Sequence, residues 1–283
     1  MTDKYNGVHA PSLPLTCADA PPDFWAAGSV SDMEPVLCLL PSPLLGPSCW
    51  RPVADVLSDR GWAVAGVPPP SRAPRCAADA LGTYLAAIPS DRDVVLIPHS
   101  NAGLFVPWLA AQRRVAGYVF ADAGLPSDAG SSVPMIPAEF YDMLAGKADD
   151  AGLLPPWTQW WDSEDLSGLF PDAQTRETVE QDQQRLPLFY FEESVPVPTD
   201  WPAQPGAYLA FGDTYAAERT AAVAHDWPVT TLPGEHLHML VDPVGVATAI
   251  TDLIAKFPFR KFLRATLMHH SCSIRALVMS AFD

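Results

Sequence analysis

The stretch from Asp93 to Gly103, DVVLIPHSNAG, constrains the fold of this chain more than any other segment. Its apolar residues 94–97 are mostly β-branched and are bounded by polar residues, a pattern typical of a buried strand. From Gly103 onward the spacing of apolar residues favours a helix. Ser100 is therefore expected on a sharp turn from strand to helix, where its hydroxyl lies above the end of a sheet and the helix N-terminus favours developing negative charge. This is a suitable position for a nucleophile.

Strand and helix patterns alternate on both sides of this stretch. The strands are expected at 35–40, 62–67, 93–97, 115–121 (closing at Asp122), 206–211 and 229–232, and the helices at 50–57, 77–88, from 103, 216 to about 225 and 243 to about 257. This alternation predicts an α/β fold with a mostly parallel sheet and helices on both faces. Ligands bind such sheets at the carboxyl ends of the strands, where Ser100 and Asp122 both fall.

The alternation of strands and helices also divides the chain into segments. Residues 35–125 and 206–257 are expected to form the core, and 283 residues with 48% hydrophobic content suffice for one sizeable core. The prolines of residues 1–34 predict an extended N-terminal lead-in, and residues 258–283 form a tail without an assigned role.

Residues 126–205 interrupt the alternation and are expected to form a helical cap inserted after the strand that ends near Asp122. Helix-compatible pieces lie at 137–144 and 174–184. The segment is rich in tryptophan and phenylalanine, which favours an apolar small-molecule substrate.

Composition excludes several partners. The net charge of −16 argues against nucleic acid and anionic membranes, and no apolar segment is long enough to span a bilayer. The polar residues 1–7 lack the apolar core of a signal peptide, so a cytoplasmic protein is expected. The five scattered cysteines lack zinc spacing and no Gly-x-Gly-x-x-Gly follows a strand, so neither a metal nor another cofactor is expected. The oligomeric state is left open.

The segment Pro98-His99-Ser100-Asn101-Ala102 resembles the nucleophile elbow of the α/β-hydrolase family, whose usual form is Gly-x-Ser-x-Gly. Pro98 stands at the first glycine position and Ala102 at the second, so only the small size of the second residue is kept. The resemblance covers roughly residues 35–125 and 206–257. It implies the fold of that family and an esterase- or thioesterase-like serine hydrolase, with serine, acid and histidine in that chain order.

The resemblance places the general base at His236, in a Gly-x-His loop between the last strand and the last helix. His238 is the alternative base. His99, directly before the serine, holds a position where the family often has a histidine that is not the base, and it is assigned to packing.

Two aspartates are candidates for the acid that orients the base. Asp122 ends the strand after the elbow helix, where some branches of the family, notably thioesterases, place their acid. Asp213 follows the next core strand, the commoner location, but the usual Gly-x-x-Asp spacing would put the acid at Tyr215. Asp122 is therefore preferred, with Asp213 as the alternative.

The resemblance also implies two backbone N–H groups that bind the oxyanion. One belongs to Asn101, directly after the serine. The other comes from the loop after the first firm strand. If Pro43 occupies the donor position there is no N–H to donate, whereas a register shifted by one residue puts Leu44 there.

These residues support one leading hypothesis and two alternatives. The leading hypothesis is a serine hydrolase that cleaves an ester, thioester or lactone of an apolar acyl group through an acyl-enzyme on Ser100, with His236 as base. The unusual elbow and oxyanion loop motivate a non-hydrolytic lyase or cyclase. A small-molecule-binding protein without catalysis is the third possibility, because fold does not fix function.

Overall fold

The structure is a computed structural model that describes residues 34–67, 72–126 and 129–258. The expected lead-in and tail lie outside the described residues, apart from Glu34 and Pro258.

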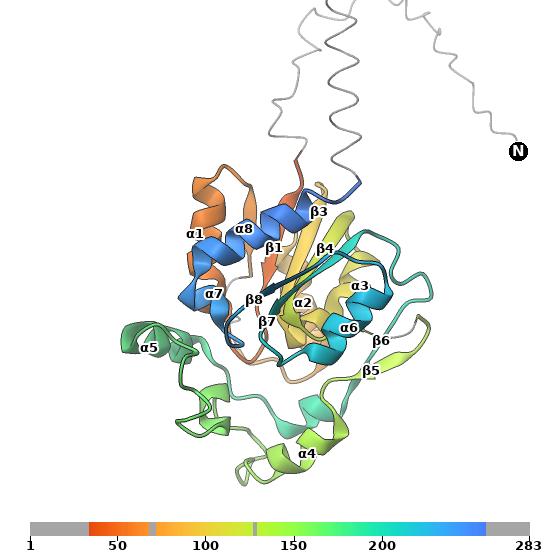
Figure 1. Cartoon of the computed structure of the whole chain (residues 1–283). Coiled ribbons are helices and arrows are strands. Elements are labelled where there is room, and N and C mark those ends of the chain that lie inside the picture. Colours follow the sequence, from red (N-terminus) through yellow and green to blue (C-terminus); the bar gives the residue numbers. More distant parts are fainter. Residues whose placement is uncertain (1–33, 68–71, 127–128, 259–283) are drawn as a thin grey trace, which may run out of the picture. The chain divides into compact units, whose positions relative to one another are not determined.

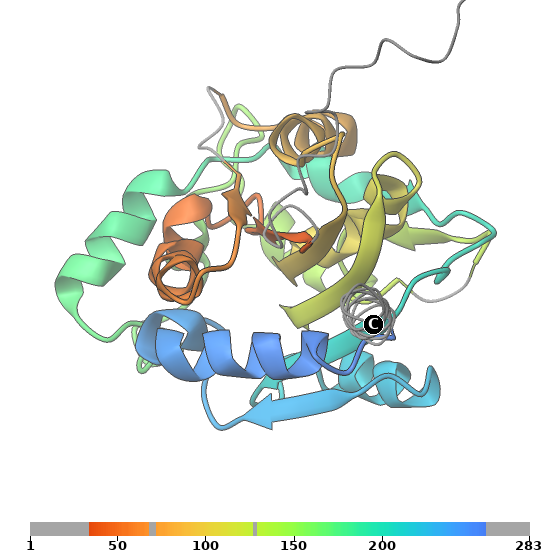
Figure 2. The ribbon, with the colours of Figure 1, turned by 90° about the horizontal axis from the view of Figure 1, so that it is seen from above.

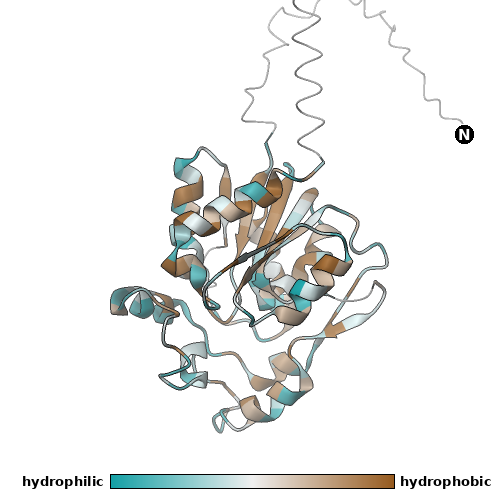
Figure 3. Cartoon of the chain, viewed as in Figure 1, coloured by the Kyte–Doolittle hydropathy of each residue, from teal (hydrophilic) through white to brown (hydrophobic). Residues whose placement is uncertain are grey.

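Six parallel strands form one sheet in the order β2-β1-β3-β4-β7-β8 (Figure 1). Their bounds are β1 Val36–Leu40, β2 Val64–Gly66, β3 Val94–Ser100, β4 Val115–Ala123, β7 Gly206–Phe211 and β8 Val229–Leu232. The predicted α/β fold with a mostly parallel sheet is confirmed. β1, β3 and β7 are buried along their whole length, as expected for parallel strands covered on both faces. Figure 3 shows this as hydrophobic strands between the helices.

β3 is longer than the sequence pattern predicts, because it continues through Pro98 to Ser100. Pro98 pairs with Leu40 at the last position of the β1–β3 ladder, and the register with β4 shifts between His99 and Ser100. The missing N–H of Pro98 therefore falls where the regular ladder ends, and it does not stop the strand early.

Helices cover both faces of the sheet. α1 (Arg51–Asp59) and α8 (Pro243–Ile254) pack side by side on one face, while α2 (Ala77–Ala87), α3 (Val106–Ala110) and α6 (Ala216–Ala224) lie on the other (Figures 1 and 2). The Asp242 side chain caps α8 by accepting a hydrogen bond from the Gly245 N–H.

Two local predictions differ from the structure. The helix expected from Gly103 begins as a 3-10 turn, η3 (Asn101–Phe105), before α3 continues it. The segment expected to be a loop between the last strand and the last helix contains the short helix α7 (His238–Val241). These segments of five and four residues are too short for a 3.6-residue period to be visible in the sequence.

Residues 126–205 lie beyond the carboxyl ends of the strands (Figure 1). They contain α4 (Ala138–Ala145), α5 (Ala173–Asp182), η4 (Trp157–Trp160), η5 (Leu188–Glu192) and an antiparallel ribbon of β5 (Ser132–Pro134) and β6 (Ser194–Pro196). The ribbon was not predicted, because strands of three residues that end in proline carry no readable alternation.

Polar contacts between side-chain carboxylates of this cap segment and backbone N–H groups help to fasten it to the core. The Asp182 carboxylate, at the end of α5, accepts a 2.8 Å hydrogen bond from the backbone N–H of Ser48 in η2 (Pro47–Trp50). The Glu193 carboxylate accepts a 2.7 Å hydrogen bond from the N–H of Ala77, the first residue of α2. An anion at a helix N-terminus is favourable, so Glu193 also stabilises α2.

None of the helices within the described ranges is long and apolar enough to cross a bilayer.

We expect Gly103→Ala to destabilise the protein and Gly82→Ala to stabilise it. A Cβ at Gly103 would lie 2.0 Å from the backbone oxygen of Gly124, whereas a Cβ on the exposed helical Gly82 meets nothing within 4 Å. Overpacking of this kind typically costs about 1–3 kcal/mol, and replacing a helical glycine by alanine gains up to about 1 kcal/mol. Urea unfolding of both variants and of the unmodified protein measures the differences in free energy of unfolding. Equal stability of the two variants would contradict the close packing of the elbow against β4.

Candidate active site

Ser100 lies on a strained turn at the carboxyl end of β3. Its backbone has φ +57° and ψ −131°, a conformation that residues other than glycine rarely adopt and that costs on the order of 1–3 kcal/mol. Gly103 and Gly124 allow the following turn to pack directly against the end of β4. Strain of this kind, maintained by a buried framework, is characteristic of functional positions.

His236 and Asp122 meet beside this turn. The Nδ1 atom of His236 is 2.7 Å from the Oδ2 atom of Asp122, whose side chain is fully buried. The other oxygen of Asp122 accepts a 3.0 Å hydrogen bond from the N–H of Phe211, at the end of β7. Because a carboxylate only accepts hydrogen bonds, Nδ1 carries the proton and Nε2 is left as the proton acceptor.

The alternative acid and base lie elsewhere. Asp213 is 86% exposed at its side chain and pairs with Arg219 at 2.9 Å on the surface. His238 is the first residue of α7, with its ring 5.6 Å from that of Phe211. The structure thus brings Asp122 to His236 and brings neither alternative to this pair.

Tyr215 is the hydrogen-bond partner of the Ser100 hydroxyl, at 3.3 Å between the two oxygens. Within the described ranges no hydrogen bond joins Ser100 to His236. The ring of Tyr215 lies 5.6 Å from that of His236. Burial raises the pKa of the Tyr215 phenol, so the group stays neutral and retains its proton.

The contact between Tyr215 and Ser100 was not predicted. The only sequence signal was that Tyr215 occupies the fourth position of the segment starting at Gly212, where the commoner family spacing has the acid. A tyrosine at a position where the family has the acid indicates a side chain that points toward the site.

His99 lies behind the His236 loop and is completely buried. Its Nε2 is 2.9 Å from the backbone oxygen of His236, and the two rings are 4.5 Å apart. Burial first, and then the neighbouring His236, hold the pKa of His99 well below its usual range, so the ring is neutral and Nε2 donates. His99 packs, as expected, and also holds the backbone of the loop that carries His236.

Asn101 follows the serine and is the first residue of η3, where a backbone N–H has no acceptor within the helix. Its side chain instead binds the cap. The amide nitrogen donates to the Met135 backbone oxygen at 2.8 Å, and the amide oxygen accepts from the Tyr190 hydroxyl at 3.2 Å. Asn101 therefore joins the cap directly to the nucleophile turn.

The second expected oxyanion donor is engaged within its own loop. The N–H of Leu44 donates to the hydroxyl oxygen of the buried Ser42 at 3.3 Å. Pro43 has no N–H. This hydrogen bond is long and therefore weak. It must break before the Leu44 N–H can donate to a substrate oxygen.

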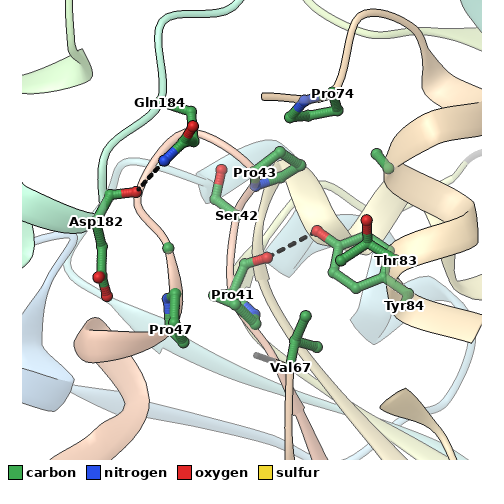
Figure 4. A pocket seen from close by; sticks show the side chains of 12 residues that line it. Pro41, Ser42, Pro43, Pro47, Val67, Pro74, Thr83, Tyr84, Asp182 and Gln184 are labelled. Atoms are coloured by element: carbon green, nitrogen blue, oxygen red, sulfur yellow. Dashed lines mark hydrogen bonds between the residues drawn. The ribbon is translucent and has the colours of Figure 1, made fainter. Parts of the chain in front are cut away.

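A small, partly open cavity of about 30 Å³ lies between this loop, α2 and the cap (Figure 4). Its lining is mostly apolar and includes Pro41, Ser42, Pro43, Val67, Ala80, Tyr84, Asp182 and Gln184. The Tyr84 hydroxyl fixes the loop by donating to the Pro41 backbone oxygen at 2.7 Å. Since β1 pairs with β3 up to Leu40 and Pro98, the loop and Ser100 leave neighbouring strands at the same level.

Within the described residues, no cluster of three or more histidine, cysteine, aspartate or glutamate side chains has the arrangement of a metal site.

Comparisons with known proteins identify the fold. No family model matches the chain, and no curated protein sequence matches it significantly. Among solved structures, polyneuridine aldehyde esterase is similar with a TM-score of 0.61 and 18% identity, over 78% of this chain and 99% of that one. A pyrethroid hydrolase from Sphingobium faniae has a TM-score of 0.56 and 19% identity, over 80% and 99% of the two chains. A variant of tomato methylketone synthase I complexed with β-ketoheptanoate has a TM-score of 0.57 and 14% identity, over 79% and 98%. The resemblance expected from the elbow is thus confirmed at the level of architecture: the chain has the α/β-hydrolase fold.

Proposed function

We propose that the protein is a serine hydrolase that cleaves an ester, thioester or lactone of a largely apolar small molecule through an acyl-enzyme on Ser100. The observation that carries the proposal is that a strained serine and a His236–Asp122 pair with a fully buried aspartate both lie at the carboxyl ends of the strands. Two of the similar structures are named as an esterase and a pyrethroid hydrolase, which agrees with ester hydrolysis.

In this mechanism the Ser100 oxygen attacks the substrate carbonyl carbon while Nε2 of His236 takes the hydroxyl proton. The tetrahedral intermediate then collapses, the bond to the leaving group breaks, and the leaving group receives that proton from His236. A water molecule repeats both steps on the acyl-enzyme and releases the acid. Asp122 keeps the proton of the histidine on Nδ1 and stabilises the imidazolium.

The Ser100 hydroxyl must exchange its hydrogen bond to Tyr215 for one to His236 when substrate binds. Catalytic hydrogen bonds are often absent or long in unliganded enzymes and form in the substrate complex. A 3.3 Å hydrogen bond between two neutral hydroxyls is weak, so the exchange costs little.

The cavity beside the loop of residues 41–47 supports an apolar substrate. Four of its lining residues are prolines, and the loop that lines it follows β1, the strand next to that of Ser100. We assign it to the acyl chain of the substrate, since apolar burial supplies binding energy without a specific hydrogen bond.

The engaged Leu44 N–H favours a second candidate function, a non-hydrolytic lyase or cyclase that uses His236 for proton transfer. With Pro43 unable to donate and Leu44 bound to Ser42, the oxyanion of an acyl transfer would have one fewer backbone donor, which typically costs 10²–10³ in rate. A proton transfer that forms no tetrahedral intermediate does not need that donor.

Intact-mass analysis after treatment with a fluorophosphonate probe tests the proposal. We expect one adduct on Ser100 that is absent in Ser100→Ala and strongly reduced in His236→Ala, because the serine needs its base. If the folded unmodified protein forms no adduct, hydrolysis is contradicted, and turnover without incorporation of ¹⁸O from labelled water would identify the second candidate.

Asp122→Asn and Asp213→Asn are matched variants that test which aspartate orients His236. In Asp122→Asn the amide oxygen can still accept from Phe211, but the amide N–H faces Nδ1 of His236, moves the proton to Nε2 and removes the base. We expect kcat to fall by about 10⁴-fold in Asp122→Asn and by less than about 2-fold in Asp213→Asn. Steady-state hydrolysis of a p-nitrophenyl ester measures both variants, and the reverse ranking would overturn the assignment.

Ala80→Leu and Ala78→Leu test the role of the cavity. Ala80 is buried and lines the cavity, whereas Ala78 lies at an exposed position of the same helix, α2. Ala78→Leu is therefore the control for the added side-chain volume. We expect Ala80→Leu to raise KM for long-chain p-nitrophenyl esters by about 10-fold or more, since two to three lost methylene contacts are worth about 0.8 kcal/mol each. Acetate esters should be unaffected in both variants. Unchanged chain-length preference in Ala80→Leu would place the acyl chain elsewhere.

A further inference from the structure

We propose that Tyr215 is a further catalytic residue, whose hydroxyl leaves Ser100 when substrate binds and donates a hydrogen bond to the leaving-group oxygen. This inference rests on the proposed serine hydrolase function.

The strand order places Tyr215 on the leaving-group side of the serine. The sheet runs β2-β1-β3-β4-β7-β8, and Ser100 ends the third of these strands. The loop expected to bind the oxyanion follows β1, on one side of β3. Asp122, Tyr215 and His236 follow β4, β7 and β8, all on the other side.

The oxyanion and the leaving group of the substrate are expected on opposite sides of Ser100. In the tetrahedral intermediate, the oxyanion faces the backbone N–H donors, and the leaving group must face the histidine that protonates it. Tyr215 contacts Ser100, and its ring centroid lies 5.6 Å from that of His236, so both residues lie on the side of the serine that the leaving group would face. Tyr215 therefore points to the leaving group rather than to the oxyanion.

The distance fits this role. The hydroxyl of Tyr215 is 3.3 Å from the Oγ atom of Ser100, and in the intermediate the leaving oxygen is bonded to the same carbon as Oγ. The leaving oxygen is thus two bonds from Oγ. A small rotation of the Tyr215 side chain therefore brings its hydroxyl from Oγ to the leaving oxygen.

The group is a donor at neutral pH, because burial raises the pKa of the phenol. It hydrogen-bonds but does not transfer its proton. As the bond between carbon and the leaving oxygen breaks, the electron pair goes to that oxygen and the proton comes from Nε2 of His236. Tyr215 stabilises the negative charge that develops on the oxygen before this proton arrives.

The test is a series of esters with one acyl group and leaving groups of increasing pKa, from p-nitrophenol to an aliphatic alcohol, hydrolysed by the unmodified protein and by Tyr215→Phe. For the aliphatic ester we expect kcat/KM of Tyr215→Phe to fall about 10²-fold, the range seen when a charge-stabilising donor is removed. For the p-nitrophenyl ester, whose phenolate is stable without a donor, the fall should be less than about 3-fold. A steeper dependence of kcat/KM on leaving-group pKa is a signature that a packing role would not produce.

Tyr118→Phe is the matched control. It removes a largely buried tyrosine hydroxyl that bonds Gln204, away from the site, and it should leave the leaving-group dependence unchanged. Circular dichroism and fluorophosphonate labelling of Ser100 in Tyr215→Phe report whether the fold and the nucleophile persist.

An equal loss for all leaving groups, or no loss at all, in a labelled and folded Tyr215→Phe would overturn the role of Tyr215 and leave the serine hydrolase intact. Failure of the unmodified protein to label at Ser100 or to hydrolyse any ester of the series would overturn both proposals.

Discussion

The buried carboxylate of Asp122 joins three strand ends, and the arrangement of the site depends on it. One oxygen holds the ring of His236 on the loop after β8, and the other accepts from the N–H of Phe211 at the end of β7. The residue itself lies at the end of β4, with φ +43°. A buried carboxylate is costly unless it is hydrogen-bonded, and each of its two oxygens accepts a hydrogen bond here.

Because Asp122 on β4 is the aspartate that contacts His236, the loop after β7 supplies no carboxylate to this histidine. Asp213 lies on the surface with Arg219, and Tyr215 turns inward to the serine. The acid and the tyrosine thus approach the site from adjacent strands. The unusual spacing after Gly212 is thus accompanied by an aspartate at the end of the neighbouring strand, where it contacts His236.

The sequence was sufficient to predict the strands and the turn at Ser100, but not the side-chain contacts within the site. Long apolar runs fixed β1, β3 and β7, and the abrupt end of one of them at small residues around Ser100 identified the turn. The His236 loop was recognisable because the last strand and helix are strongly patterned. The Tyr215 hydroxyl, the engaged Leu44 N–H and the β5–β6 ribbon were not predictable, because each depends on side-chain direction or on pairing between distant segments. Short elements such as α7 carry no period for a pattern to detect.

The hydrogen-bond donors around Ser100 are distributed unevenly, and this distribution bears on the kind of substrate. On the β1 side Pro43 has no N–H and Leu44 donates to Ser42, while on the β7 side a neutral phenol already contacts the nucleophile. Donors contribute most where the largest charge develops. A poor leaving group develops more charge as its bond breaks than an activated one does. Under the proposed mechanism, the Asn101 backbone N–H is the free donor for the oxyanion and the Tyr215 hydroxyl is the donor for the leaving group, so the site favours unactivated alkyl esters, whose leaving oxygen needs such a donor most.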